Sequence, residues 1–441
     1  MPQKPNVIFF FSDQQRWDTV GCYGQKLNVT PNLDRLAKNG IRFENAFTCQ
    51  PVCGPARACI QTGKYATEIG CYRNDIALPL NEKTLAHYYK EAGYEVAYMG
   101  KWHLASTGEE MDYKTKPIPP ERRGGYDGYY RTADVLEFTS HGYNGYVYDE
   151  NMKRVDFKGY RPDCITDFAV DFIKNRNNKK PFFIFLSHIE PHHQNDRNRY
   201  EGPEGSKEKF KDYEEPGDLK GTAGDWRENY PDYLGCCHSL DYNVRKLMNA
   251  LKDQEIDDNT VVIYTSDHGS HFKTRNNEYK RSCHDGCIRI PMIAWGPGFE
   301  GGRVINELVS LIDIPPTLLA CAGIEKPAQM KGRPLQELLK SDVQNWPQEV
   351  FLQISESQVG RAVRTKKWKY SVRALDKDGW NDSWSDTYVE DCLYDLENDP
   401  FEKNNLVTDA KYKNVRENLK QILKRRMKEA GEPVPVILPQ N

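Results

Sequence analysis

The residue types with the clearest chemistry lie in residues 53–63, which read CGPARACIQTG and fit the spacing C-x-P-x-R-x-x-x-x-T-G. Pro is favoured in the first turn of a helix, where its missing N–H would have no partner. Residues 56–61 contain no helix breaker, and Gly63 can end the helix. Cys53 is then predicted just before a helix N-terminus, where free N–H groups and the dipole attract anions. Arg57, one turn later, can direct its guanidinium donors to the same anion.

Other polar side chains stand just past short apolar segments that have the composition of strands. These segments are residues 6–11, 94–99, 182–186 and 260–265. In an open α/β sheet, ligands bind outside the carboxyl ends of the strands. Polar residues that follow several strands are therefore predicted to meet at one rim. They are Asp13, Lys101, His103, His192, Asp267 and His268.

Alternation of such segments with helical patterns predicts an α/β fold with a large, mixed and mostly parallel sheet sandwiched by helices. A further strand is predicted at 290–295, and the segment 193–229 is predicted to be a long surface loop. The predicted helices cover residues 31–40, 85–92, 168–174 and 233–251.

The pattern changes from about residue 346 onward. Short strands at 350–354, 361–365 and 368–372, followed by a basic helix at 412–429, predict a smaller antiparallel sheet with one helix packed on it. We therefore expect a catalytic domain over residues 1–345 and a C-terminal α+β subdomain over residues 346–441.

Composition narrows the class of protein. The chain has 441 residues, 38% of them hydrophobic and 28% charged, with a formal net charge of -3. The balanced charge gives no whole-chain attraction to polyanions, so no nucleic-acid partner is expected. No apolar run approaches the roughly 20 residues of a membrane span, and none near the N-terminus reaches signal-peptide length. We expect a cytoplasmic protein, or a periplasmic or secreted one if a leader has been removed. The twelve Cys show no spacing of a disulfide framework.

The motif at residues 53–63 resembles the signature of the type I sulfatases, the formylglycine-dependent enzymes of the alkaline phosphatase superfamily. The other matching pieces occur in the family's order from residue 6 to about residue 406. The resemblance implies a sulfuric ester hydrolase in which Cys53 is oxidised to formylglycine, whose hydrate attacks sulfur. It also implies a transient partner, the formylglycine-generating maturase.

Two pairs of residues resemble the metal ligands of that family. They are Asp13-Gln14 and Asp267-His268. On their own, such acids could equally be solvated strand-end residues. Many family members have a second Asp in place of Gln14 and Asn in place of His268. Together with Cys53, these residues imply a site for one divalent cation. Oxygen ligands suit calcium, which is our first expectation, with manganese or magnesium behind it. The imidazole of His268 tilts the site toward a transition metal.

The resemblance also assigns roles around the sulfate group. Arg57 and Lys101 position its oxygens, and His103 removes a proton from the hydrate. His192 and Lys280 assist the leaving group. For Lys280 the alternative is a solvated loop lysine, because the residues around it depart from the commoner family pattern.

Leaving-group recognition is assigned to loops rich in His, Arg, Asn and Asp, and Trp380 and Trp384 are further candidates. This composition suits hydroxyls and carboxylates, so we expect an exo-acting enzyme whose substrate is a small-molecule or oligosaccharide sulfate ester, a sulfated sugar. The alternatives are a phosphonate monoester or phosphodiester hydrolase with the same machinery, an aryl or steroid sulfatase, and a non-catalytic carbohydrate-binding relative. The predicted substrate-binding residues are Arg73, His188, His193 and Arg275.

Overall fold

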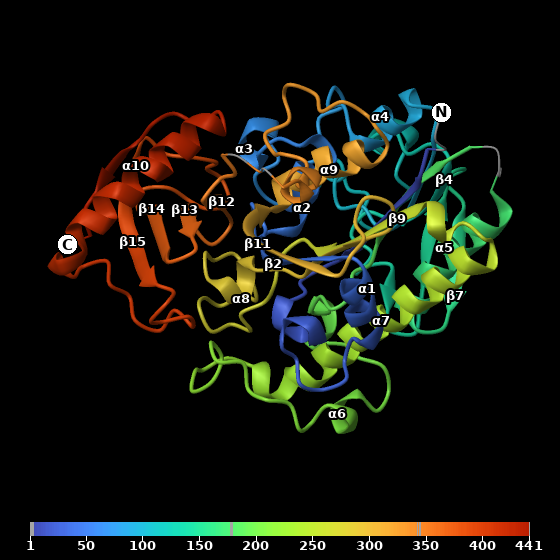
Figure 1. The fold of residues 1–441 in the computed structure, drawn as a ribbon, viewed down its shortest axis with the longest axis horizontal. Helices are drawn as coiled ribbons and strands as arrows, with labels where there is room; N and C mark the ends of the chain where they lie inside the picture. The colour runs from blue at the N-terminus through green and yellow to red at the C-terminus, as the bar shows by residue number, and fades with distance from the viewer. Residues whose placement is uncertain (1–3, 177–179, 342, 344, 441) are drawn as a thin grey trace.

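The computed structural model describes residues 4–176, 180–341, 343 and 345–440 (Figure 1). Within these residues the larger sheet has eleven strands in the order β11-β2-β10-β9-β1-β8-β3-β4-β6-β5, with β7 paired to β6. Its strands are β1 (Asn6–Ser12), β2 (Ile41–Phe47), β3 (Glu95–Lys101), β4 (Tyr129–Ala133), β5 (Ser140–His141), β6 (Asn144–Asp149), β7 (Arg154–Lys158), β8 (Phe182–Ser187), β9 (Thr260–Ser266), β10 (Met292–Trp295) and β11 (Arg303–Ser310).

The central strands are parallel and buried on both faces. Strand β1 pairs in parallel with both β8 and β9, and all seven of its residues are buried. Successive side chains of a strand point to opposite faces of the sheet. Val7 and Phe9 accordingly pack in one apolar cluster, and Ile8 and Phe10 pack in another. A continuous apolar run, unlike an alternating one, is typical of such a central strand.

Helices cover both faces of this sheet. One apolar cluster includes residues of α1 (Pro31–Asn39), α5 (Arg161–Asn175) and α7 (Trp226–Asp253). The other includes residues of α2 (Cys53–Thr62), α3 (Ala66–Ile69), α4 (Leu85–Glu91) and α9 (Ile314–Cys321). The short helices α6 (Ser206–Lys209) and α8 (Asp285–Ile288) lie in connections.

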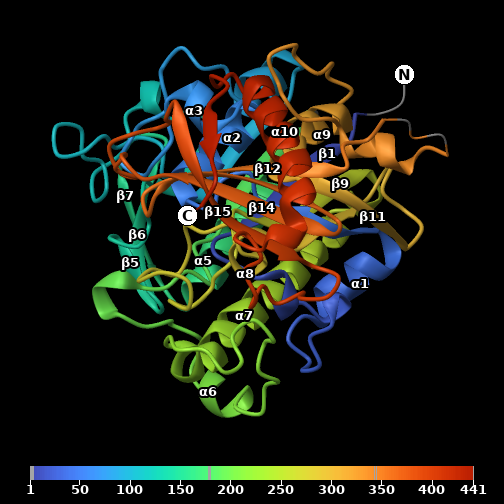
Figure 2. The same ribbon diagram turned by 90° about the vertical axis from the view of Figure 1, so that its left-hand side faces the viewer.

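The smaller sheet contains β12 (Glu349–Ile354), β13 (Val359–Thr365), β14 (Trp368–Ala374), β15 (Thr387–Asp395) and β16 (Val436–Leu438) in that order. Helix α10 (Lys413–Glu429) lies against this sheet (Figure 2). Its residues Leu419, Leu423 and Met427 are buried in the larger apolar cluster. The rings of Tyr65 and Phe351 pack edge to face with centroids 5.3 Å apart, and both rings belong to the larger apolar cluster. The two sheets therefore share a continuous core.

The predicted fold is confirmed: a mixed sheet between helices, followed by a smaller sheet with one helix. The domain boundary after residue 345 stays a prediction. Strands β2, β4 to β7 and β11 and helix α9 were not recognised in the sequence. The smaller sheet is antiparallel over β12 to β15, but β16 adds to β15 in parallel.

Two local predictions need correction. Cys53 was predicted just before helix α2, but the helix begins at Cys53. Pro55 is then the third residue of the helix, where its missing N–H costs no hydrogen bond, because the first four N–H groups of a helix have no partner within it. The predicted loop 193–229 contains α6 and ends where α7 begins at Trp226.

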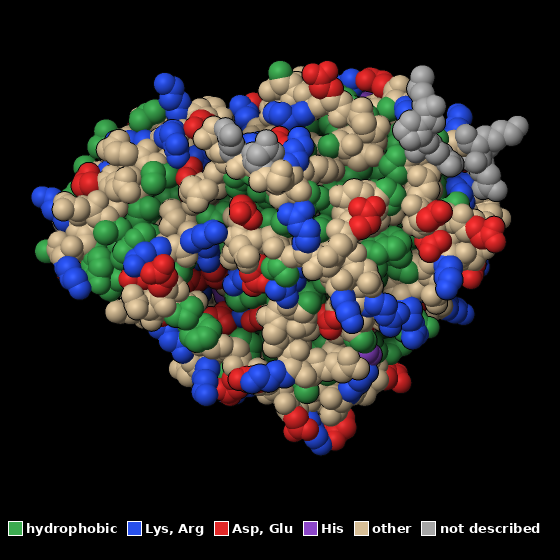
Figure 3. Space-filling view, viewed as in Figure 1, with side chains coloured by type: hydrophobic (Ala, Val, Ile, Leu, Met, Phe, Trp, Pro, Cys, Tyr) green, Lys and Arg blue, Asp and Glu red, His purple; other side chains and the backbone are tan. Residues whose placement is uncertain are grey.

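On the face shown in Figure 3, acidic and basic side chains are intermixed. Among the described residues, no helix is both long and apolar enough to cross a membrane.

Gly100 fixes how closely β3 and β8 approach at the end that carries Lys101. Its φ is +99°, and an added Cβ would lie 1.8 Å from the Ser187 carbonyl oxygen. Gly100→Ala is expected to lower the free energy of unfolding by about 2–5 kcal/mol, the sum of left-handed backbone strain and overpacking. Gly298→Ala is the matched control, because Gly298 has a φ of +83° with open space around it. It should show only the strain, about 1–2 kcal/mol. Equal losses for the two variants in urea unfolding would contradict the steric argument.

Candidate active site

The site is built at the carboxyl ends of β9, β1, β8 and β3, which are neighbours in the sheet, and at the N-terminus of α2. Cys53 is the first residue of α2 and is buried. Its Sγ lies 3.4 Å from Asp13 Oδ1, 3.3 Å from His268 Nε2 and 2.7 Å from Lys280 Nζ. Burial, together with the charge of Asp13, raises the pKa of the Cys53 thiol to about 12. The side chain is therefore a neutral thiol near pH 7.

Asp13 is held by two buried cations. Its Oδ2 accepts hydrogen bonds from Lys101 Nζ at 2.7 Å and from Arg57 Nη2 at 3.0 Å. Burial alone would raise the pKa of Asp13, but Lys101, His192 and Arg57 outweigh burial and hold that pKa well below its ordinary value. Arg57 is itself fixed, because its Nη1 donates to the Lys101 carbonyl and to Ser187 Oγ. Its Nε is buried without a hydrogen-bond partner among the described residues.

The negative charge of Asp267 is offset less fully by neighbouring cations than that of Asp13. Its Oδ1 accepts from the backbone N–H groups of Gln14 and His268 at 2.9 and 2.8 Å. Its Oδ2 is buried and has no hydrogen bond from the described part of the chain, and Arg57, at 3.7 Å, is the cation paired with it there. Burial and the neighbouring Asp13 raise the pKa of Asp267 to about 7. An uncompensated buried carboxylate beside a second one is costly, so this arrangement favours a cation between them.

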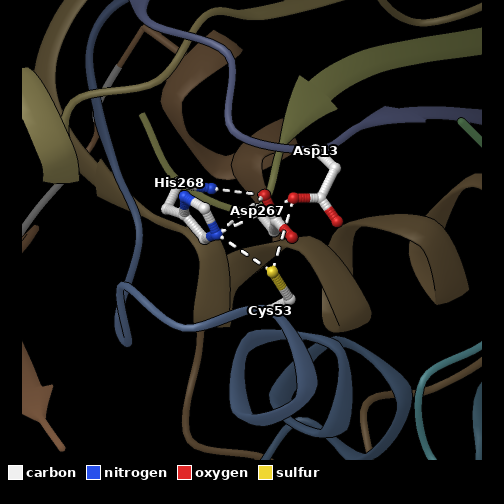
Figure 4. Close-up of side chains that lie close together, drawn as sticks. All are labelled: Asp13, Cys53, Asp267 and His268. Carbon is white, nitrogen blue, oxygen red and sulfur yellow. Dashed lines mark hydrogen bonds and ion pairs between the residues drawn. The ribbon is translucent and has the colours of Figure 1, made fainter. Parts of the chain in front are cut away.

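His268 is oriented toward the same point. Its Nδ1 lies 2.9 Å from the Gly269 carbonyl oxygen, which can only accept, so Nδ1 carries the proton. Nε2 then presents its lone pair, which is how metal-bound imidazoles are fixed by an outer partner. Figure 4 shows the side chains of Asp13, Cys53, Asp267 and His268 close together. Their ligand atoms all lie within 4.8 Å of one another. The residues therefore fit a divalent cation.

Gln14 stands beside this cluster. Its side-chain nitrogen donates to Tyr200 Oη at 2.9 Å, and its backbone has a φ of +68°. The left-handed backbone is uncommon for a residue other than Gly, and it turns the chain directly after Asp13. Gln14 also lines the cleft described below.

Three further predicted residues face the cleft that opens over Cys53. Lys280 Nζ contacts Cys53 Sγ and lies 3.2 Å from His192 Nε2. Burial, with Lys101 next in importance, holds the pKa of His103 well below its ordinary value, and burial with Lys280 does the same for His192. Both imidazoles are therefore neutral at pH 7 and able to accept a proton.

The cleft encloses about 200 Å³. Beyond the residues already named, its walls come from loops of both sheets and include Asn74, Lys114, Glu137, Tyr279, Arg281 and Trp380. Trp380 lies after β14 and so brings the smaller sheet to the cleft. Trp384, which is similarly exposed, does not line it.

The structure contradicts two of the predicted substrate contacts. His188 is fully buried, stacks on Phe10 with ring centroids 4.8 Å apart, and contacts Thr166. It belongs to the apolar layer under the sheet, so the predicted substrate contact is wrong. Arg275 donates to the carbonyls of Phe401 and Glu402 and does not line the cleft. It fastens a loop instead.

Arg73 and His193, the other two predicted substrate-binding residues, pack against residues that line the cleft. Arg73 donates to the carbonyls of Asn74 and Asp75, and its guanidinium lies 4.7 Å from the centre of the Trp380 ring. It supports the wall of the cleft through Trp380, and its predicted contact with the substrate stays a prediction. His193 packs on Tyr279 with centroids 4.3 Å apart and is outside the lining set.

Sequence reasoning missed Asp134, which positions the chain around His103. Its carboxylate accepts from the N–H groups of Leu104, Ala105 and Ser106, each at 3.0 Å, and its carbonyl accepts from His103 N–H at 2.6 Å. Asp134 directly follows β4. The strand-end rule would have found it if that strand had been recognised.

A buried cluster of two carboxylates and an imidazole, beside a helix N-terminus and three cationic side chains, can hold a divalent cation next to an oxyanion. Residues 5–324 match the family described as Sulfatase, and residues 277–429 match the family described as N-sulphoglucosamine sulphohydrolase, C-terminal. The chain belongs to the sulfatase family, whose members hydrolyse sulfate esters. The resemblance of the Cys53 motif is thereby confirmed at the level of the family.

Individual relatives cover nearly the whole chain. The sulfatase YidJ of Escherichia coli is 31% identical over 98% of this chain and 88% of its own length. An N-acetylglucosamine-6-O-sulfatase of Bacteroides thetaiotaomicron is 27% identical, with the same two coverages. A solved structure of a yidJ sulfatase from Bacteroides fragilis superposes with a TM-score of 0.83 at 25% identity and covers 98% of both chains.

Proposed function

We propose that this sulfatase removes sulfate from a sulfated sugar, in an exo-acting manner, through a formylglycine formed from Cys53 and one divalent cation. The observation that supports this best is the position of Cys53. Its Sγ stands where an oxygen of the formylglycine hydrate would be, within 3.4 Å of Asp13, His268 and Lys280. The thiol itself is neutral, so the unmodified residue is a poor nucleophile.

The chain's own residues divide the remaining work. Formylglycine would supply a hydrate oxygen as the nucleophile, and the cation would polarise the sulfate group. Arg57 and Lys101 orient the sulfate oxygens. Arg57 Nε is a buried donor that has no hydrogen-bond partner among the described residues, so it is available to a sulfate oxygen. His103 accepts a proton from the hydrate. Lys280 and His192, 3.2 Å apart and both on the cleft, hold and deliver the proton at the leaving-group oxygen.

The cation is held by Asp13, Gln14, Asp267, His268 and the modified residue 53 in this proposal. Calcium is our first choice, because two carboxylates and an amide suit a hard cation. The imidazole of His268 keeps manganese and magnesium as alternatives. The maturation enzyme that forms formylglycine would be a transient partner of the chain before it folds around buried Cys53.

A sugar as the leaving group is supported by the walls of the cleft and by the named relatives. Trp380 and Tyr279 offer flat aromatic faces, and Asn74, Lys114 and Glu137 offer hydrogen-bonding groups for hydroxyls. Besides the N-acetylglucosamine-6-O-sulfatase, an ulvan-active sulfatase of Formosa agariphila is 30% identical over 98% of this chain and 82% of its own length.

A phosphonate monoester hydrolase activity is the second candidate. The pair Asp267-His268, in place of the commoner Asp-Asn, is the feature that favours it. A comparison of turnover of an aryl sulfate and an aryl phosphonate by the same preparation separates the two. Faster turnover of the phosphonate would replace our first proposal.

Formylglycine at residue 53 is testable by mass spectrometry. The peptide that contains residue 53 should carry an aldehyde in place of the thiol in active enzyme. Cys53→Ala should fold normally, because one small side chain changes, and should show no measurable turnover. Production in a host without a maturase should give folded protein that carries only the thiol and is inactive. Full turnover by protein that carries only the thiol would contradict the mechanism.

The metal assignment is tested by Asp267→Ala. The variant loses the carboxylate that lacks a full set of partners, so the bound metal should fall from about one per chain toward zero. Turnover should fall on the order of 1,000-fold, because metal polarisation is worth several kcal/mol. Asp241→Asn is the control: Asp241 is also buried but binds the N–H groups of Asn32 and Leu33 at the start of α1. It should keep its metal. Full activity in metal-free wild-type enzyme would rule out the assignment, and re-addition of calcium or manganese identifies the ion.

Trp380 and Trp384 distinguish a sugar platform from an exposed aromatic residue. Trp380→Ala is expected to raise the KM for a sulfated sugar about tenfold, because stacking of one ring is worth about 1.5 kcal/mol. Inhibition by inorganic sulfate should be unchanged, since sulfate occupies only the Arg57 and Lys101 end of the site. Trp384→Ala, whose side chain is 40% exposed against 38% for Trp380, should leave both quantities unchanged. Equal effects of the two substitutions would show that Trp380 does not contact the sugar.

A further inference from the structure

The carboxylate of Glu356 connects the smaller sheet to two separate walls of the active-site cleft. Glu356 lies in the turn between β12 and β13, and its side chain is 1% exposed. Its Oε1 accepts from the backbone N–H of Asn74 at 2.7 Å. Its Oε2 lies 2.5 Å from Arg281 Nη2. The adjacent Ser357 donates its hydroxyl to the Arg281 carbonyl at 2.7 Å, so Arg281 is held at both ends.

Each of these contacts leads in one more step to a reacting group. Asn74 Oδ1 accepts from the N–H of Gly54 at 2.9 Å, and Gly54 directly follows Cys53. Arg281 directly follows Lys280, whose Nζ contacts Cys53 Sγ and His192 Nε2. The buried carboxylate of Glu356 therefore contacts both Asn74, which binds the residue after Cys53, and Arg281, which follows Lys280.

Three residues at or next to these contacts have an uncommon backbone conformation. Asp75, Arg281 and Glu356 all have a left-handed backbone, with φ values of 56°, 72° and 66°. Residues other than Gly adopt this conformation only where surrounding contacts fix it. The backbone N–H of Glu356 also donates to the Gly379 carbonyl at 2.7 Å, next to Trp380. Glu356 thus contacts three loops beside the cleft, two through its carboxylate and one through its backbone N–H.

We propose that Glu356 is a positioning residue through which the smaller sheet sets the relative placement of residue 53 and Lys280. Glu356 does not line the cleft and acts only through Asn74 and Arg281. This inference rests on the proposed catalytic roles of residue 53 and Lys280. It predicts a loss in turnover, since residue 53 attacks the sulfate and Lys280 assists the leaving group, and little loss in substrate binding.

Glu432 is a matched control for a purely structural role. It is also a buried carboxylate of the C-terminal region: it pairs with Arg361 at 2.8 Å and accepts from Thr67 of α3 at 2.9 Å. It therefore joins the same two parts of the molecule, but none of its partners lines the cleft. Removal of Glu432 should cost stability without a change in turnover.

The experiment compares E356A, E356Q, E432A and wild type with an aryl sulfate. Turnover is normalised to the formylglycine and metal content of each preparation. E356A should lower kcat about 10- to 100-fold with KM changed less than threefold, because small displacements of reacting groups cost rate. E356Q keeps an acceptor for Asn74 N–H but loses the charge that pairs with Arg281, so it should recover part of the loss. E432A should keep the kcat of wild type even if its melting temperature falls.

A double-mutant cycle supplies the second readout. If Glu356 acts through Asn74, the combined E356A and N74A substitutions should lower kcat by clearly less than the product of the single effects. A kcat for E356A or E356Q within twofold of that of E432A would overturn the proposal, as would full multiplicativity in the cycle. If E356A does not fold, the isosteric E356Q decides alone, with an expected loss of at least about threefold. A wrong sugar assignment would appear as poor turnover of sugars by wild type and would leave this comparison intact.

Discussion

The pairing of Asp13 with Lys101 and Arg57 is the interaction on which the site depends. Asp13 and Asp267 end two adjacent parallel strands, so the sheet forces two carboxylates together in a region without exposed surface. Two buried like charges are tolerated only if cations offset them. Lys101 and Arg57 offset Asp13. Asp267 remains short of a partner, which is the electrostatic reason for a cation site at this point.

The balance of charge also explains why an anion would enter this site. The cations Arg57, Lys101 and Lys280 outnumber the two carboxylates, so the site is positive before any metal is bound. The N-terminus of α2 adds its free N–H groups. A neutral thiol at Cys53 adds no negative charge to repel an oxyanion. Low exposure strengthens each of these interactions, because little water screens them.

A site residue could be predicted from the sequence where the strand that leads to it has a clear apolar pattern. Asp13 and Asp267 directly follow strands with apolar runs, and Lys101 is the last residue of β3, so these strand ends are visible in the sequence. Asp134 was missed because β4 reads YYRTA, a mixed pattern that hides the strand. His188 was misplaced because nearness to His192 in sequence does not tell which face a residue occupies. Residues 184, 186 and 188 lie two apart and share the face that packs under α5 and α7.

The contribution of the smaller sheet could not be predicted, because it depends on contacts between distant parts of the chain. Glu356 and Asn74 are 282 residues apart, and neither stands in a recognisable motif. Only the folded chain shows that the turn between β12 and β13 lies against the loops that flank Cys53. In the proposed mechanism, the larger sheet carries the groups that bind the transferring sulfate, and loops that contact the smaller sheet lie around them. A change of leaving group therefore requires changes in loops that both sheets hold, whereas the charge pairing of Asp13 can stay as it is.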